Sequence, residues 1–136
     1  MKRILGIGLA VLVALGSGWV WGASGKSAIN RALQIAELRD SLLEGRAAVL
    51  DARLDIYSVN FGDASRHLEA ARSALHTADV RLNGLDRQED ATRLKIAMTR
   101  IDEAQRMAGR LNQDANSLTA DAAKTINDVL GSAAKR

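Results

Sequence analysis

The sequence is distinctive first for what it lacks. It has no proline and no cysteine, and only 3% of its 136 residues are aromatic. Without proline, no ring interrupts a helix interior, and the scarcity of aromatic and β-branched residues disfavours a sheet. Without cysteine, the chain has no disulfide, no thiolate metal site and no bacterial lipidation cysteine. The composition therefore predicts an all-α protein, and the length allows one domain of modest size.

The chain also lacks a patch of one charge. Its formal net charge is +3, but Lys2 and Arg3 precede an apolar segment, which leaves 17 of the 19 basic residues against 16 acidic ones. Acidic and basic residues alternate closely, as in "DRQEDATRLK". Because a nucleic-acid interface needs a concentrated positive surface, we expect no nucleic-acid partner.

Residues 4–23 follow a basic N-region, residues 1–3, and contain no charge. Twenty helical residues extend about 30 Å, the thickness of a hydrocarbon core, and Trp19 and Trp21 lie where interfacial aromatics belong. We predict a transmembrane anchor in a bacterial inner membrane, with the C-terminal domain in the periplasm because the N-terminal charges favour the inside. The alternative is a cleaved signal peptide and a soluble periplasmic protein.

Small residues recur at every fourth position of this anchor: Gly6, Ala10, Ala14, Gly18 and Gly22. Such a stripe lets two membrane helices approach closely, and it predicts a homodimer formed through the anchor. The competing interpretation is that glycine and alanine are simply frequent in membrane helices.

A polar hinge at residues 24–26 precedes a helical bundle over residues 27–131, and residues 132–136 form a tail. The apolar spacing predicts helices at about 27–59, 61–82, 88–111 and 116–130, packed antiparallel. The bundle has three helices if 88–130 is continuous and four if it breaks. We favour a break near 112–116, where Asn112, Asp114 and Asn116 suit a turn better than a helix interior.

The helix at 27–59 carries two adjacent apolar seams, each stepping by three and four residues. The first seam comprises Ile35, Leu38, Leu42, Gly45, Val49, Ala52, Ile56 and Val59. The second comprises Ala36, Leu43, Ala47, Leu50, Leu54 and Tyr57, with Asp40 at its one polar step. Together they predict a wide apolar face buried in a bundle rather than a dimeric coiled-coil seam. Asp40 is expected at the rim, beside Arg39 or Arg46; the other interpretation is a buried polar group that selects register.

The segment "NFGD", residues 60–63, predicts a reversal of the chain because Asn60 can cap a following helix. A reversal brings Leu38 close to Leu82, whereas a continuous helix would form a rod. Further along, Gly84 is expected to end the second helix in a left-handed conformation, and Gly131 is expected to end the last helix.

The segment "DIYSVNFGDASRHLEAARSAL" resembles the helix-turn-helix of a tetratricopeptide-type repeat. The spacing of Phe61, Ala64, Leu68 and Ala71 matches the second helix of that repeat, although no second copy follows at its period. The resemblance implies a groove for an extended peptide with Tyr57 and Phe61 as its floor; alternatively, the two rings staple the hairpin tip. The whole layout is also similar to uncharacterised single-pass envelope proteins of Gram-negative bacteria with the same "NFG.A" turn.

No catalytic, cofactor or metal pattern is predicted. His67 and His76 lie on nearly opposite sides of one helix, and the carboxylates have basic neighbours within a turn, as solvated faces do. We therefore predict a non-enzymatic interaction or scaffold protein with an unknown protein partner. The alternatives are a periplasmic sensory or ligand-binding bundle, and a structural envelope spacer resembling a spanin-type coiled coil.

Overall fold

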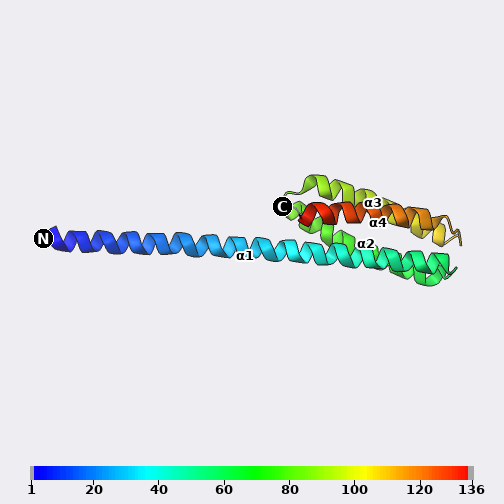
Figure 1. Cartoon of the computed structure of the whole chain (residues 1–136), viewed down its shortest axis with the longest axis horizontal. Helices are drawn as coiled ribbons and strands as arrows, with labels where there is room; N and C mark the ends of the chain where they lie inside the picture. The colour runs from blue at the N-terminus through cyan, green and yellow to red at the C-terminus, as the bar shows by residue number, and fades with distance from the viewer. Residues whose placement is uncertain (1, 135–136) are drawn as a thin grey trace. The chain divides into compact units, whose positions relative to one another are not determined.

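The computed structural model describes the backbone of residues 2–134 and the side chains of residues 27–134. This part of the chain is helical and has no strand, which confirms the all-α prediction. Its helices are α1 (Lys2–Tyr57), α2 (Phe61–Gly84), α3 (Gln88–Ala108) and α4 (Ala115–Ala134), coloured along the chain in Figure 1. The chain divides into two compact units, Met1–Gln34 and Ile35–Arg136. The second unit holds the last part of α1 together with α2, α3 and α4.

The helix boundaries differ from the predicted ones at several places. Helix α1 continues through residues 24–26, where the sequence predicts a hinge. A single glycine and a serine lower helix stability by about 1 kcal/mol or less each, and they do not by themselves interrupt the backbone hydrogen bonds. Gly131 lies inside α4, which continues to Ala134. The favoured break exists, because residues 109–114 separate α3 from α4.

Helices α1 and α2 form an antiparallel hairpin within the second unit. Arg81 on α2 donates from Nη1 to Ser41 Oγ on α1 at 3.0 Å, and its Nε lies 3.5 Å from Glu37 Oε2. Nearer the turn, His67 Nδ1 lies 2.7 Å from Asp55 Oδ2. The sequence separation of the contacting residues increases with their distance from the turn at residues 58–60. This pattern arises only where the chain reverses its direction. The predicted hairpin is confirmed, and a continuous rod over 27–82 is excluded.

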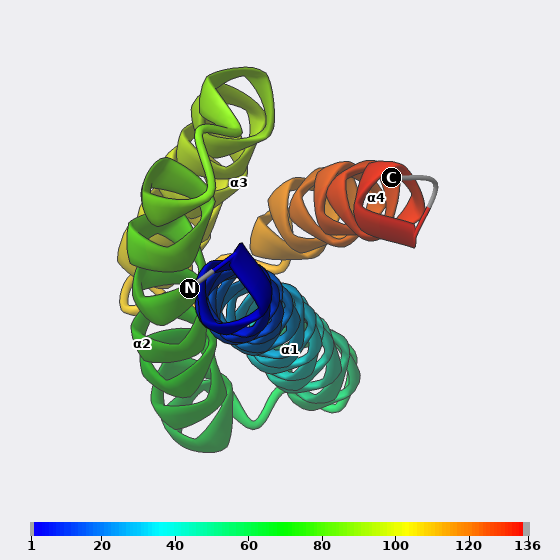
Figure 2. The ribbon, with the colours of Figure 1, turned by 90° about the vertical axis from the view of Figure 1, so that its left-hand side faces the viewer.

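The first seam of α1 faces the core of this bundle. Leu38, Leu42, Val49, Ala52 and Ile56 have no exposed surface. Large and small apolar residues alternate at most buried positions of α2. Helix α3 packs against both α2 and α4, and Figure 2 shows the three helices. Alanine at so many buried positions lets the helix axes approach toward the short end of the usual 8–10 Å range. The fully buried side chains on α2, α3 and α4 include Ala64, Leu68, Ala71, Leu75, Ala78, Leu82, Leu94, Ala97, Ile101, Ala104, Ala108, Ala115, Ala122, Ile126 and Val129.

All three turns between helices share one backbone pattern. At Val59, Asp86 and Leu111 the backbone is left-handed, with φ of 61°, 57° and 57°. The amide of the following residue bonds back to the carbonyl five residues earlier, as in Asn60 to Asp55 at 2.7 Å, and the same bond recurs at the other two turns. This is the hydrogen bonding of a Schellman motif. The second turn therefore places its left-handed residue at Asp86 rather than at Gly84, because α2 runs to Gly84.

Candidate functional site

The small-residue stripe Gly6, Ala10, Ala14, Gly18 and Gly22 lies outside the residues whose side chains the structure describes, so self-association through it stays a prediction. The same holds for the anchor at residues 4–23. Within residues 27–134, no helix is long and apolar enough to cross a membrane. The surfaces described below belong to the second unit, from Ile35 onward.

Tyr57 and Phe61 flank the first turn but have opposite environments. Phe61, the first residue of α2, is only 8% exposed and packs in the core. Tyr57, the last residue of α1, is 79% exposed. The structure therefore does not bring the two rings together into one exposed surface, and Phe61 acts as a core residue of the hairpin.

The second apolar seam of α1 is the main exposed apolar feature of the bundle. We call Ala36, Leu43, Ala47, Leu50, Leu54 and Tyr57, with Asp40 between them, the outer seam. Leu43 and Leu54 are 47% and 67% exposed. Ala36, Asp40 and Ala47 are exposed as well, and only Leu50 is partly buried. These residues form a stripe of a little over three heptads along one side of α1.

The prediction that both seams of α1 would be buried is wrong for this outer seam. Helix α2 contacts α1 on one side of the first seam, through the hydrogen bond from Arg81 to Ser41. Helix α4 contacts α1 on the other side of the first seam, where Arg53 Nε donates to Asn116 Oδ1 at 3.0 Å. With both neighbours on the first-seam side, no helix among the described residues lies beside the opposite side of α1 from Ile35 onward (Figure 2).

Asp40 lies on this exposed side, not in the core. The structure thus supports its position outside the bundle and excludes a buried role within one molecule. It forms no ion pair with Arg39 or Arg46 among the described residues, where the ion pairs of the bundle lie elsewhere. Its charge interrupts an otherwise apolar seam.

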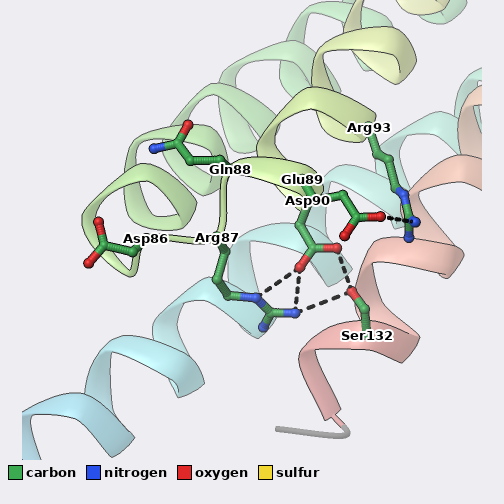
Figure 3. Close-up of a pocket in the computed structure, with 7 residues that line it drawn as sticks. All are labelled: Asp86, Arg87, Gln88, Glu89, Asp90, Arg93 and Ser132. Carbon is green, nitrogen blue, oxygen red and sulfur yellow. Dashed lines mark hydrogen bonds and ion pairs between the residues drawn. The ribbon is translucent and has the colours of Figure 1, made fainter.

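A buried polar cluster joins the turn before α3 to the last turns of α4 (Figure 3). Asp90 Oδ2 accepts from Arg87 Nε at 2.8 Å and lies 2.6 Å from Arg87 Nη2. Ser132 Oγ lies 2.8 Å from Asp90 Oδ1 and 3.2 Å from Arg87 Nη2. The side chains of Arg87 and Asp90 are only 11% and 9% exposed. They border a cavity of about 310 Å³ that Asp86, Gln88, Glu89 and Arg93 also line.

This arrangement is suited to holding helices together. Both carboxylate oxygens of Asp90 already accept hydrogen bonds, and the Ser132 hydroxyl also lies 2.7 Å from the carbonyl of Val129. A carboxylate so occupied has little capacity to take a proton from a substrate. The cluster therefore ties α4 to the start of α3 by charge-assisted hydrogen bonds.

Sequence reasoning missed this cluster because it treated Asp90 as a solvated carboxylate with a basic neighbour. One signal was present. Asp90 precedes Leu94, Ala97 and Ile101 at the same steps of four, three and four that mark the core of α3. An acidic residue at a core position must be paired when buried, and Arg87 one turn earlier is its partner.

The two histidines lie in different surroundings on α2. His67 contacts Asp55 on α1 rather than Asp63, which pairs with Arg66. His76 lies by a surface cavity of about 330 Å³ lined by Glu69, Arg72, Ser73 and Met98. Within the described residues, no three acidic, histidine or cysteine side chains are grouped to hold a metal ion.

In comparisons with protein-family models, with curated proteins and with solved structures, no significant match to this chain was found.

Proposed function

We propose that the protein is a membrane-anchored, non-enzymatic interaction or scaffold protein whose helical bundle lies in the periplasm of a bacterial cell. The uncharged residues 4–23 supply the anchor, and Lys2 and Arg3 supply the orientation. The bundle supplies a surface for another protein.

The observation that carries the proposal is the exposure of the outer seam. Leu43, Leu54 and Tyr57 are each about half exposed or more on one face of one helix. Single exposed apolar residues are ordinary, but a contiguous apolar stripe is typical of an interaction site. Because the stripe repeats at helical spacing, the partner that fits it best is another amphipathic helix.

The anchor is tested by fractionating cells that express the full chain. The protein should pellet with membranes at its full 136-residue mass. Recovery of a soluble form that begins near Ala23 or Gly25 would establish a cleaved signal peptide instead and contradict the anchor.

The interaction surface is tested by photo-crosslinking of the full chain in cells. A photoreactive side chain at position 54 should give a discrete crosslinked protein adduct, since Leu54 is one of the most exposed residues of the outer seam. The matched control is position 80, because Val80 is similarly exposed but lies on α2, outside the stripe. If both positions give the same adducts, or neither gives any, the outer seam is not an interaction site.

A further inference from the structure

The outer seam has the spacing of a coiled-coil strand. Its steps alternate between three and four residues from Ala36 to Tyr57. In heptad notation, a step of three leads from an a position to a d position and a step of four from d to a. The a positions are Asp40, Ala47 and Leu54, and the d positions are Ala36, Leu43, Leu50 and Tyr57. In the sequence, the same spacing continues upstream to Leu33 and Ile29.

The residues that flank the seam are sorted by charge. Each of Glu37, Glu44 and Asp51 directly follows a d position, so one flank, the e positions, is acidic. Arg39, Arg46 and Arg53 each directly precede an a position, so the other flank, the g positions, is basic. Flanking charges of this kind set the partner and the orientation of a coiled coil.

The central charged side chains of both flanks form no ion pair within the part of the chain that the structure describes. Glu37 pairs with Arg81, and Arg53 donates to Asn116. By contrast, the ion pairs among the described residues include none with Arg39, Glu44, Arg46 or Asp51. Arg46 Nε is even buried without a hydrogen-bond partner.

We infer that the outer seam binds the outer seam of a second copy of this chain, as a parallel, in-register coiled coil. This inference rests on the proposed function and names the partner of the same surface. In a parallel dimer, each g position faces the e position of the next heptad on the partner helix. Arg39 then faces Glu44 and Arg46 faces Asp51, on both sides of the dimer. The positive charges of the g flank are thus complementary to the negative charges of the e flank on an identical chain.

The opposite orientation is disfavoured by the same charges. An antiparallel pair places g beside g and e beside e, so that arginine meets arginine and carboxylate meets carboxylate. Like charges at such positions destabilise the pair. The bundle does not obstruct the parallel dimer, because α2 and α4 contact α1 on the first-seam side.

Asp40 has a distinct place in this dimer. At an a position in register, it faces Asp40 of the other copy, and a polar a residue selects register at the expense of affinity. Replacement of Asp40 by leucine should therefore strengthen self-association. The Val80→Cys control described below distinguishes such a gain from non-specific aggregation, because aggregation would also cross-link a position outside the outer seam.

The orientation is tested with single-cysteine variants of the full chain in bilayers, since the sequence has no cysteine. Leu43→Cys and Leu54→Cys should each give a disulfide-linked dimer on mild oxidation. These positions lie about 16 Å apart along the helix, so an antiparallel dimer could cross-link at only one of them. Val80→Cys, an exposed position on α2, is the control and should stay monomeric.

Charge reversal tests the pairing itself. Arg39→Glu and Glu44→Arg should each weaken dimerisation by about tenfold, because each replaces two attractive contacts with two repulsive ones. The double variant Arg39→Glu/Glu44→Arg restores opposite charges and should recover most of the affinity. Energy transfer between labelled chains measures the affinity, and circular dichroism verifies that each variant remains helical.

The inference is overturned if neither cysteine position cross-links, if only one does, or if Asp40→Leu weakens association. Its failure is separable from that of the proposed function. If the outer seam binds a different protein, the photoreactive side chain at position 54 would still cross-link to that protein, and only the dimer would be contradicted. If position 54 gives no adduct at all, both the dimer and the proposed interaction site are contradicted.

Discussion

Gly45 on α1 lies directly against the side chain of Leu75 on α2. A Cβ built at Gly45 would lie 2.6 Å from Cδ2 and 2.8 Å from Cγ of Leu75, closer than carbon atoms can pack. Leu75 is fully buried and has little room to move. The absence of a side chain at Gly45 is therefore what lets α1 and α2 meet at this level of the core.

We expect Gly45→Ala to lower the free energy of unfolding by about 1 kcal/mol. Overpacking costs about 1–3 kcal/mol, which outweighs the roughly 1 kcal/mol gained by replacing a helical glycine with alanine. The control is Gly131→Ala in α4, where a built Cβ meets nothing within 4 Å. That variant should instead be more stable by about 0.5–1 kcal/mol. Urea denaturation of both variants checks the opposite signs, and equal stabilisation would mean that α1 and α2 are further apart.

Substitution of the left-handed turn residues should stabilise the bundle. Val59 and Leu111 are both exposed, so their side chains contribute little packing. A left-handed conformation costs a non-glycine residue about 1–2 kcal/mol, and more for a β-branched one. Val59→Gly should therefore raise the free energy of unfolding by about 0.5–1 kcal/mol, net of the larger unfolded-state entropy of glycine.

The same change at Asp86 provides the comparison. Aspartate tolerates the left-handed region better than valine, so Asp86→Gly should have the smaller effect in the same denaturation experiment. If Val59→Gly destabilises the protein instead, the turn is not left-handed at that residue.

The buried pair Arg87–Asp90 should show strong coupling between its members. Asp90→Leu leaves the guanidinium of Arg87 buried without a counter-charge, which should cost about 3–5 kcal/mol. The double variant Arg87→Met/Asp90→Leu removes both charges and should recover most of that loss, because apolar replacements of buried ion pairs are often neutral. Thermal unfolding of the two single variants and the double variant measures the coupling. Additive losses would show that the two side chains act independently.

The sequence could predict the core of the bundle because apolar periodicity records which face of a helix avoids water. Leu38, Leu42, Val49 and Ile56 lie at the predicted steps and are buried. Periodicity does not record what covers a face, and for this reason the outer seam was wrongly placed inside the bundle. An apolar stripe has the same spacing whether it is buried by helices of its own chain or by another chain.

The turns and the polar cluster were harder to predict for different reasons. Val59 and Leu111 adopt left-handed backbone without a glycine, because the position of each helix end imposes that conformation. Composition carries no sign of such a residue. Asp90 and Ser132 lie 42 residues apart and meet only once α3 and α4 pack together.

Two leucine-to-alanine variants distinguish the core from the outer seam in the same experiment. Leu68 on α2 has no exposed surface, whereas Leu54 is 67% exposed. Both substitutions remove the same atoms and change helix propensity little, so any difference reports burial. At low protein concentration, Leu68→Ala should lower the free energy of unfolding by about 2–5 kcal/mol, and Leu54→Ala should change it by no more than about 0.5 kcal/mol.

The dependence of the melting temperature on protein concentration then shows whether the outer seam binds a second copy of the chain. A chain that dimerises through the outer seam gains stability as its concentration rises, because association stabilises the folded state by mass action. The wild-type melting temperature should therefore rise with concentration in detergent or lipid, and Leu54→Ala should reduce that rise. Leu68→Ala should keep it, since Leu68 lies on the core side of α2 and not at the outer seam. If Leu54→Ala destabilises the dilute protein as much as Leu68→Ala does, Leu54 is buried within one molecule and no seam is left exposed for a partner.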